Sequence, residues 1–325
     1  MNQTPDKKFT NWLQSLKRKS YIKECFHSDE NCLLPIKLAH SIQNNRILNK
    51  IAVNGEVLCI EHLEENGDIK LILKKTGRKK ATTFTGFCNY HDTKIFIPIE
   101  SKDYQERDKE QEFIFAYRAL AKEYHVKKTS IEILKRAINN TSPQVPAREI
   151  LELHLEGCQI AMKELEQNKI MFNTALEQKN FEIIETRVIK FYGEFLLAVS
   201  SFFAIEQDLK GNIINDISNF NKELKYFCLT IFPQNGKTYI LLSYLKKNKK
   251  VLAPVIKQIS EKSIAEQKII FSNIVAIYVE NFVLSPEKWE KMSDAEKSVF
   301  LNLYKETIPF PKESLSQARN INLFL

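Results

Sequence analysis

Two short segments, far apart in the chain, carry the side chains that most constrain how it can fold. The first is C-F-H-S-D-E-N-C at residues 25–32, and the second is C-N-Y-H at residues 88–91. A cysteine thiolate and a neutral imidazole are good zinc ligands, and four such donors close a tetrahedral site. We therefore predict that three cysteines and one histidine of these segments converge on one structural Zn²⁺ ion. They are Cys25, Cys32, Cys88 and His91.

Other interpretations of these cysteines remain open. Free cysteine is among the most buried residue types, so buried thiols without a metal are the alternative. Six residues separate Cys25 from Cys32, whereas zinc knuckles usually have about two to four. His27 lies in this gap and could replace either cysteine as a ligand. Cys59 and His62 are also three positions apart, but without a second pair nearby we expect them to be half-buried strand residues.

Length and composition indicate an ordinary globular protein. The chain has 325 residues, of which 43% are hydrophobic and 27% are charged, which suits two or three domains with substantial cores. No apolar run reaches the roughly 18 residues of a membrane span, and the start lacks a signal-peptide core. Six irregularly spaced cysteines do not suggest a disulfide framework. We therefore expect a reduced, cytoplasmic protein without a membrane partner.

The charge balance favours a polyanionic partner. The net charge of +8 is typical of proteins that bind nucleic acid, although a Lys-rich composition is equally typical of cytosolic proteins of low-GC bacteria. A basic cluster follows the predicted hairpin described below, and its residues would contact phosphates or simply form a solvated loop. No phosphate-binding glycine loop and no G-x-S-x-G motif occurs, which excludes those two kinds of catalytic site. The basic cluster consists of Lys74, Lys75, Arg78, Lys79 and Lys80.

Residues 1–101 are predicted to form a small α+β unit that contains the zinc module. An extended run ends at His40, and the apolar spacing over residues 42–51 suits a short helix. Asn54-Gly55 and Asn66-Gly67 are turn signals on either side of E-V-L-C-I-E-H-L. These signals predict a β-hairpin, in which I-K-L-I-L-K-K is the second strand.

Helices are predicted in two other places. The stretch over residues 9–23 has helical apolar spacing, and we interpret it as a packed amphipathic helix rather than a phosphate-binding arm. Residues 102–178 are predicted to be a helical region, with one helix ending near His125 and a second over residues 128–139. A long helix over residues 147–176 would form either an antiparallel hairpin or a dimer surface.

Residues 179–325 are predicted to form an antiparallel sheet with helices. Two strand-like runs flank Gly193, although the period of these apolar runs also permits helix. Asn235-Gly236 lies between two further runs and is the strongest hairpin signal in the chain. Residues 251–306 have helical patterns. The sequence therefore predicts an α+β fold with an N-terminal zinc module, a helical middle and a C-terminal antiparallel sheet with helices.

The motifs of the first unit resemble the zinc-bearing HNH endonuclease family. The residues that carry this resemblance are C-x6-C, then A-H-S-I at 39–42, then F-x-G-F-C-x2-H-D ending at Asp92. The resemblance implies a treble-clef zinc site, a ββα-metal core and cleavage of nucleic acid. The fuller pattern, with I-P-I-E at 97–100 and residues 110–123, also resembles a group of bacterial proteins.

The same resemblance implies two catalytic residues. His40 would be the general base that activates water, and Asp92 stands where the family has its final metal-binding histidine. A carboxylate there would bind Mg²⁺ or another divalent cation, which would stabilise charge on the leaving oxygen. Three features depart from the family pattern: the second knuckle is C-x2-H, the final histidine is absent, and the middle Asn is not clearly identified.

Three functions follow from these patterns. The first is nucleic-acid binding, DNA rather than RNA, with metal-dependent cleavage. The second is a non-catalytic interaction module that zinc stabilises, working as a homodimer or with a partner subunit. The third rests on Arg118 and His125, whose R-x6-H spacing resembles that of HEPN ribonucleases. Residues seven apart lie on one face of a helix, so a surface pair is the alternative there.

Overall fold

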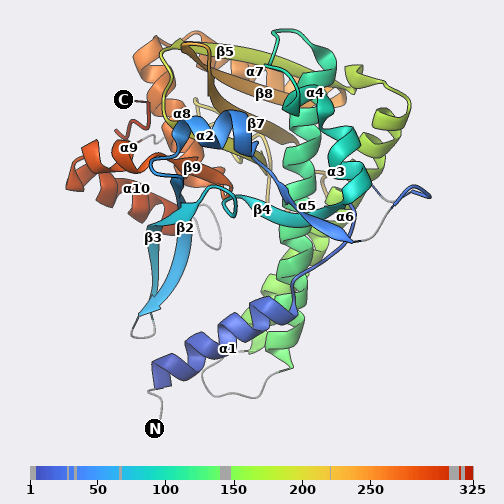
Figure 1. Ribbon diagram of the computed structural model, residues 1–325, viewed down its shortest axis with the longest axis vertical. Helices are drawn as coiled ribbons and strands as arrows, with labels where there is room; N and C mark the ends of the chain where they lie inside the picture. Colours follow the sequence, from blue (N-terminus) through green and yellow to red (C-terminus); the bar gives the residue numbers. More distant parts are fainter. Residues whose placement is uncertain are drawn as a thin grey trace.

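A computed structural model of the chain contains both helices and strands, with more residues in helices than in strands, arranged around an antiparallel sheet (Figure 1). It describes residues 5–27, 29–32, 35–65, 68–139, 148–219, 221–306, 315 and 319–324. The predicted Asn66-Gly67 turn lies outside these residues. The mixed α and β composition and the antiparallel sheet agree with the expected class. None of the helices in the described part of the chain combines the length and hydropathy that a bilayer span requires.

The main sheet has seven strands in the order β3-β2-β9-β6-β7-β8-β5, and every neighbouring pair is antiparallel. A separate two-stranded sheet pairs β1 with β4. The strands are β1 (Ile36–His40), β2 (Glu56–Glu65), β3 (Asp68–Gly77), β4 (Thr83–Cys88), β5 (Ile184–Tyr192), β6 (Leu197–Ala204), β7 (Tyr226–Gln234), β8 (Lys237–Leu245) and β9 (Phe282–Leu284).

The helices cover both faces of the sheet. They are α1 (Pro5–Lys19), α2 (Asn49–Ile51), α3 (Asn89–Ile95), α4 (Ile97–Glu100), α5 (Lys109–Ile138), α6 (Arg148–Glu177), α7 (Lys249–Ser260), α8 (Ile264–Tyr278), α9 (Pro286–Lys291) and α10 (Asp294–Glu306). A π-helical turn (Asn44–Leu48) precedes α2, so the predicted short helix over residues 42–51 is present with a wider first turn. Short 3₁₀ turns cover Phe181–Ile183 and Lys246–Asn248.

Two apolar cores lie on opposite faces of the sheet. Alternate residues of β6 show the division, since Ala198 and Phe202 pack on the α5 side and Val199 and Phe203 on the side of α7 and α8. A strand that is buried on both faces has no polar alternation. This explains why the sequence of β6 did not distinguish strand from helix.

Helices α5 and α6 form an antiparallel pair within one chain. Phe113 stacks on Phe172 with ring centroids 5.3 Å apart, and further along, the Tyr124 hydroxyl donates to Glu166 over 2.7 Å. The prediction of two helices that meet near residue 126 was wrong, because α5 is continuous through this point. Residues on both sides of the predicted break, including His125 and Ile131, are buried against the rest of the protein, and Thr129 donates its hydroxyl to the carbonyl of His125 without ending the helix.

The predicted hairpin at Asn235-Gly236 is confirmed. Both residues have positive φ, at 51° and 73°, as a type I′ turn requires, and β7 pairs with β8 across it. The strands that flank Gly193 do not pair with each other, because β5 pairs with β8 and β6 pairs with β7. Gly193 donates its N–H to the carbonyl of Gly236, so the chain passes around the end of the hairpin between β5 and β6.

The short strand β9 connects the N-terminal hairpin to the C-terminal strands of the sheet. It pairs with β6 on one side and with β2 on the other, where Leu58 faces Leu284. The predicted hairpin of residues 56–77 therefore belongs to the main sheet, and the sheet is larger than the four strands expected from residues 180–245. The division into residues 1–101, 102–178 and 179–325 stays a prediction, but the sheet takes strands from the first and third of these ranges.

The N-terminal helix and the small sheet position the site described next. In α1, Leu16 is buried against Ala137 and Leu151, which fits the interpretation as a packed helix. Strand β1 pairs with β4, and β4 leads directly into α3. His40 faces Thr83 at the far end of this pairing. A two-stranded sheet followed by a helix therefore carries both the second metal knuckle and His40.

Candidate metal centre

Main-chain pairing brings the first knuckle to the second. Phe26 donates its N–H to the carbonyl of Gly86 over 2.7 Å, so the chain beside Cys25 runs along β4. The N–H of Cys88 in turn lies 3.4 Å from the Cys25 sulfur. A Cβ built on Gly86 would lie 2.2 Å from the Phe84 ring, so only glycine fits there without displacing a core side chain. This agrees with the tight approach expected at Gly86.

The second knuckle is the first turn of α3. The Cys88 sulfur accepts a hydrogen bond from the N–H of His91 over 3.4 Å and so caps the helix. Because the two residues are three apart on this turn, their side chains point to the same side. The helix start thus places one thiol and one imidazole together, facing the first knuckle.

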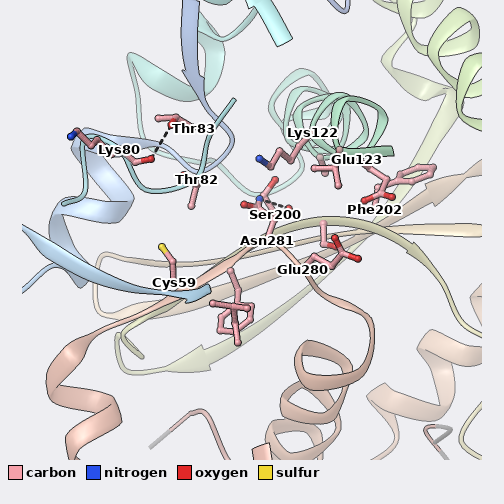
Figure 2. Close-up of a pocket in the computed structure, with 15 residues that line it drawn as sticks. Cys59, Lys80, Thr82, Thr83, Lys122, Glu123, Ser200, Phe202, Glu280 and Asn281 are labelled. Atoms are coloured by element: carbon pink, nitrogen blue, oxygen red, sulfur yellow. Dashed lines mark hydrogen bonds between the residues drawn. The ribbon is translucent and has the colours of Figure 1, made fainter. Parts of the chain in front are cut away.

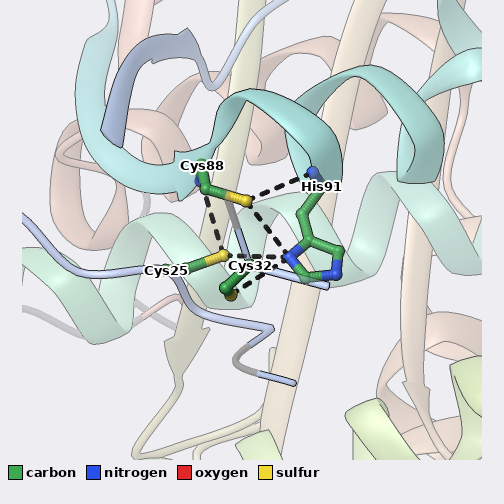
Figure 3. A group of neighbouring side chains, drawn as sticks. All are labelled: Cys25, Cys32, Cys88 and His91. Carbon is green, nitrogen blue, oxygen red and sulfur yellow. Dashed lines mark hydrogen bonds between the residues drawn. The ribbon is translucent and has the colours of Figure 1, made fainter. Parts of the chain in front are cut away.

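All four predicted ligands meet at one point (Figure 3). The Nδ1 atom of His91 lies 3.3 Å from the sulfurs of Cys25 and Cys88 and 3.4 Å from that of Cys32. Metal–ligand bonds of about 2.3 Å to sulfur and 2.0–2.1 Å to nitrogen, at the tetrahedral angle, would separate sulfur from nitrogen by about 3.6 Å. The observed spacings are close to the edges of such a tetrahedron. The four donors can therefore hold one metal ion.

Without a cation, burial favours the neutral forms of the Cys25 thiol and the His91 imidazole. Burial raises the pKa of the Cys25 thiol far above its usual value; the hydrogen bond from the N–H of Cys88 opposes this in part, while the nearby thiols of Cys88 and Cys32 add to it. Burial also lowers the pKa of His91, which favours the neutral imidazole. Neutral imidazole is the form that binds metals, whereas thiols must lose their protons to do so. A bound cation would supply the positive charge that several neighbouring thiolates need.

Asp29 orients the imidazole and was not among the predicted site residues. Its Oδ1 lies 3.2 Å from Nε2 of His91, and Asn31 donates its N–H to the same oxygen over 2.8 Å. A proton on Nε2 that faces this carboxylate leaves the Nδ1 lone pair for a metal ion. Burial opposes ionisation of Asp29, but hydrogen bonds from Asn31 and the nearby imidazoles lower its pKa overall. The signal was present, since Asp29 lies inside the first knuckle.

His27 does not take the place of a cysteine in the four-donor cluster. Its ring packs edge-on against that of His91, with centroids 4.8 Å apart. Its carbonyl oxygen accepts from the thiols of Cys25 and Cys32 at 3.2 and 3.4 Å. Asp29 lies 3.8 Å from its Nε2. His27 therefore contacts the cluster through its backbone and supports Asp29 with its ring.

The two residues that the resemblance assigns to catalysis lie on different elements, His40 on β1 and Asp92 on α3. Nε2 of the half-buried His40 lies 3.3 Å from the carbonyl oxygen of Arg78. Burial lowers the pKa of His40 and raises that of Asp92, and each residue also affects the pKa of the other. Arg118 influences both pKa values and is paired with Glu100 at 2.6 Å. The fold thus gathers four ionisable groups from β1, α3, α4 and α5.

Arg118 and His125 are both buried on α5, and each has internal partners. The Arg118 guanidinium lies 3.9 Å from the Phe96 ring centroid. Nε2 of His125 lies 2.8 Å from the carbonyl oxygen of Ile22 and 3.2 Å from the Thr85 hydroxyl. Seven residues span about 10 Å along a helix. The side chains of Arg118 and His125 therefore contact different parts of the protein.

Comparison with known proteins found no matching family model, no matching curated protein and no matching solved structure. The arguments about function therefore rest on the residues and their geometry.

We expect the Cys88→Ala variant to lose its bound metal and several kcal/mol of stability, because metal-binding free energy forms part of the folding free energy. Metal analysis of the purified wild type should give about one ion per chain. Thermal melts with and without a chelator should separate by about 10 °C for the wild type and coincide for the variant.

The control is Cys158→Ala, which removes a thiol on α6 outside the cluster and should leave the metal content unchanged. Equal metal content in Cys88→Ala and wild type would contradict the proposed ligand set.

Asp29→Ala should weaken metal binding about 10- to 100-fold, since loss of the carboxylate leaves the His91 ring less well oriented. Competition against a chromophoric chelator measures the affinity. Glu30→Ala changes the adjacent exposed carboxylate and serves as the matched control. If both variants bind metal equally well, Asp29 does not orient the ligand.

Proposed function

We propose that this protein binds nucleic acid through an N-terminal unit held together by a structural zinc ion, and that His40 and Asp92 cleave phosphodiester bonds there. The observation that carries this proposal is the arrangement of elements around the metal cluster. The first knuckle lies beside the antiparallel pair of β1 and β4, and β4 leads into α3, although a π-helical turn, α2 and the β2–β3 hairpin separate β1 from β4 in the sequence. His40 is at the end of β1 and Asp92 is in the first turn of α3. This arrangement resembles a treble clef with a ββα core.

The donor set supports zinc in a structural role. Three sulfurs and one imidazole nitrogen are borderline-soft ligands, which zinc prefers over magnesium or calcium. Four protein donors leave no open coordination position for a substrate or water. The proposed chemistry therefore belongs to the neighbouring His40 and Asp92 rather than to the zinc ion.

The surroundings of His40 suit a general base. When the Nε2–H donates to the carbonyl of Arg78, the lone pair of Nδ1 is free to accept a proton from water. The lowered pKa of His40, which burial causes, keeps the imidazole neutral near pH 7. Such a backbone contact fixes both the tautomer and the ring orientation. His40 would thus activate the attacking water.

Asp92 supplies a carboxylate from α3, whereas His40 lies on β1. A divalent cation such as Mg²⁺, bound by this carboxylate and the substrate phosphate, would stabilise negative charge on the leaving oxygen. Asp92 follows His91 directly, so the zinc ion would hold α3, and with it Asp92, in a fixed position relative to β1.

Exposed lysines occur on the elements that carry this pair and on the segment before β4. Lys37 on β1, Lys94 on α3, and Lys79 and Lys80 in the segment before β4 are all exposed. Within the described part of the chain, Lys79 and Lys80 take no part in an ion pair, whereas Lys74 of the same predicted cluster pairs with Glu61 at 2.8 Å. Free ammonium groups near a scissile bond would neutralise phosphates. DNA is the favoured partner on the basis of the resemblance.

A non-catalytic interaction module remains the second candidate, and one observation favours it. Arg118 lies close enough to Asp92 to lower the pKa of that carboxyl group, and a guanidinium beside a carboxylate disfavours a cation there. In this alternative, zinc maintains the fold and the lysines bind a partner without cleavage. A HEPN-like role for Arg118 and His125 has less support, since both are engaged inside the protein.

The double variant Lys79→Ala/Lys80→Ala should weaken binding to duplex DNA and reduce its salt dependence. Each lost phosphate contact lowers the slope of log K against log[salt] by about 0.9, so the expected change is about 1.8. Fluorescence anisotropy with a labelled duplex across a salt series measures the slope. Lys250→Ala/Lys257→Ala removes two exposed lysines on α7 and should leave the slope unchanged.

His40→Ala should reduce divalent-dependent nicking of plasmid DNA at least about 100-fold, because a general base contributes about 10²–10⁴ to the rate. Metal content and DNA affinity should not change. His154→Ala, which alters an exposed histidine on α6, is the matched control.

Three experimental results would contradict the proposed function or favour one of the alternatives. A wild type that binds DNA but cleaves neither DNA nor RNA with Mg²⁺, Mn²⁺ or Ni²⁺ would establish the interaction module instead. Metal-free RNA cleavage that His125→Ala abolishes would favour the HEPN-like alternative. Binding that does not respond to Lys79→Ala/Lys80→Ala would remove the proposed contact surface.

A further inference from the structure

A cavity of about 260 Å³ lies between the N-terminal part of the chain and the main sheet. Its walls come from β2, the segment that enters β4, helix α5, strand β6 and the residues that begin β9 (Figure 2). This volume is slightly below the usual range for small-molecule sites, which is about 300–1,000 Å³, and therefore suits a small ligand. Neither the metal ligands nor His40 and Asp92 line it.

One face of α5 supplies two of the charged groups that line the cavity, and Lys80 and Glu280 supply the others. Ala119, Lys122, Glu123 and Val126 follow the spacing of a single helix face, and all four line the cavity. Figure 2 shows the Lys122 amine directed into the space between α5 and the segment that carries Thr82. The Glu123 carboxyl group lies farther along the cavity. The two opposite charges are thus neighbours in sequence but separate in space.

Lys122 contacts an aromatic ring but pairs with no anionic group in the described part of the chain. Its Nζ lies 5.2 Å from the Phe84 ring centroid, and among the described residues it makes neither a hydrogen bond nor an ion pair. Burial lowers its pKa to about 8, although Glu123, Glu280 and Cys59 partly oppose this effect. A half-buried ammonium without an anion is unfavourable, so the group is suited to receive an anionic ligand.

The other end of the cavity carries carboxyl groups. Figure 2 shows Glu123 and Glu280 on the side of Phe202. Glu123 lies 3.9 Å from Lys127, outside hydrogen-bond distance. Burial raises the pKa of Glu123 to about 7, while Lys127 lowers it and Glu280 raises it. This end is suited to receive a cationic group that donates hydrogen bonds.

Among the neutral residues that line the cavity, Thr82 has an unusual backbone conformation and a buried hydroxyl group without a described partner. Its φ is +59°, which is rare for a β-branched residue and costs conformational energy. Its hydroxyl oxygen is buried, and no partner for it occurs in the described part of the chain. Asn281, by contrast, is satisfied, because it accepts from Ser41 and donates to the carbonyl of Ser200. Thr82 therefore offers an unused hydrogen bond beside Lys122.

We propose that this cavity binds a small zwitterion of amino-acid size, with its anionic group on Lys122 and Thr82 and its amine between Glu123 and Glu280. A simple anion would leave Glu280 and Glu123 with no further cation than Lys127, which lies 3.9 Å from Glu123, and a simple amine would leave Lys122 without an anion. A dipolar ligand satisfies both ends at once. Apolar residues that line the cavity, including Phe202, Val126 and Phe282, would contact its carbon atoms. This inference does not depend on the proposed cleavage activity.

The test screens the twenty common L-amino acids against the full-length protein by thermal shift and then by calorimetry. For each amino acid that binds, the matching carboxylic acid without the amine and the matching amine without the carboxylate are titrated. Loss of one charged contact of about 1.4 kcal/mol weakens binding about tenfold, so each analogue should bind at least about tenfold more weakly. Inorganic phosphate is included as a simple anion.

Variants of α5 locate the binding. Lys122→Met should abolish binding of the amino acid, whereas Lys135→Met, which removes an exposed charge from the same helix, should not. Glu123→Gln should weaken binding of the amino acid but should not change the affinity for the matching carboxylic acid without the amine. If Lys122→Met does not fold, Ala119→Leu fills the cavity and keeps every charge, and it should also prevent binding.

The proposal is overturned if no amino acid shifts the melting temperature of the wild type. It is equally overturned if phosphate or the monofunctional analogues bind as tightly as the amino acid, or if binding survives both Lys122→Met and Ala119→Leu.

Discussion

The N-terminal part of this protein depends on the main-chain pairing that holds Phe26 against Gly86 on β4. This pairing brings Cys25 to Cys88 across a long stretch of chain, and it requires glycine at position 86, because a side chain there would meet the Phe84 ring. The other three donors then follow from local geometry, since Cys88 caps the helix that carries His91 and the first knuckle returns Cys32. A metal ion would strengthen an arrangement that hydrogen bonds already favour, because thiolates need a compensating charge in a buried site.

The second constraint is the sheet, which is buried on both faces. Apolar residues of β6, β7 and β8 face α5 on one side and α7 with α8 on the other, so the C-terminal half cannot fold as a simple two-layer unit. The three-residue strand β9 adds the hairpin β2–β3 to this sheet. As a result, elements from both ends of the chain are packed side by side. The cavity that contains Lys122 and Glu123 lies at this junction.

Particular residues show where sequence reasoning succeeded and where it did not. Asn235-Gly236 and Asn54-Gly55 predicted their turns, because a positive φ at both positions is a local property of these residues. The break predicted near residue 126 was wrong, because α5 is continuous and buries residues on both sides of this point, including His125 and Ile131. Strand β9 was missed because three residues carry no period. Asp29 was overlooked because its role depends on the position of His91, 62 residues away in sequence.

By itself, the sequence determined the residue types at the metal centre, the hairpin turns and the amphipathic helices, because each depends on neighbours within a few positions. Only the tertiary structure decided that the four donors meet, that His40 and Asp92 lie on adjoining elements, and that Lys122 and Glu123 share a cavity without pairing. Those facts depend on strand order and on packing across the sheet. They join residues that are distant in the chain, and no local pattern encodes such contacts.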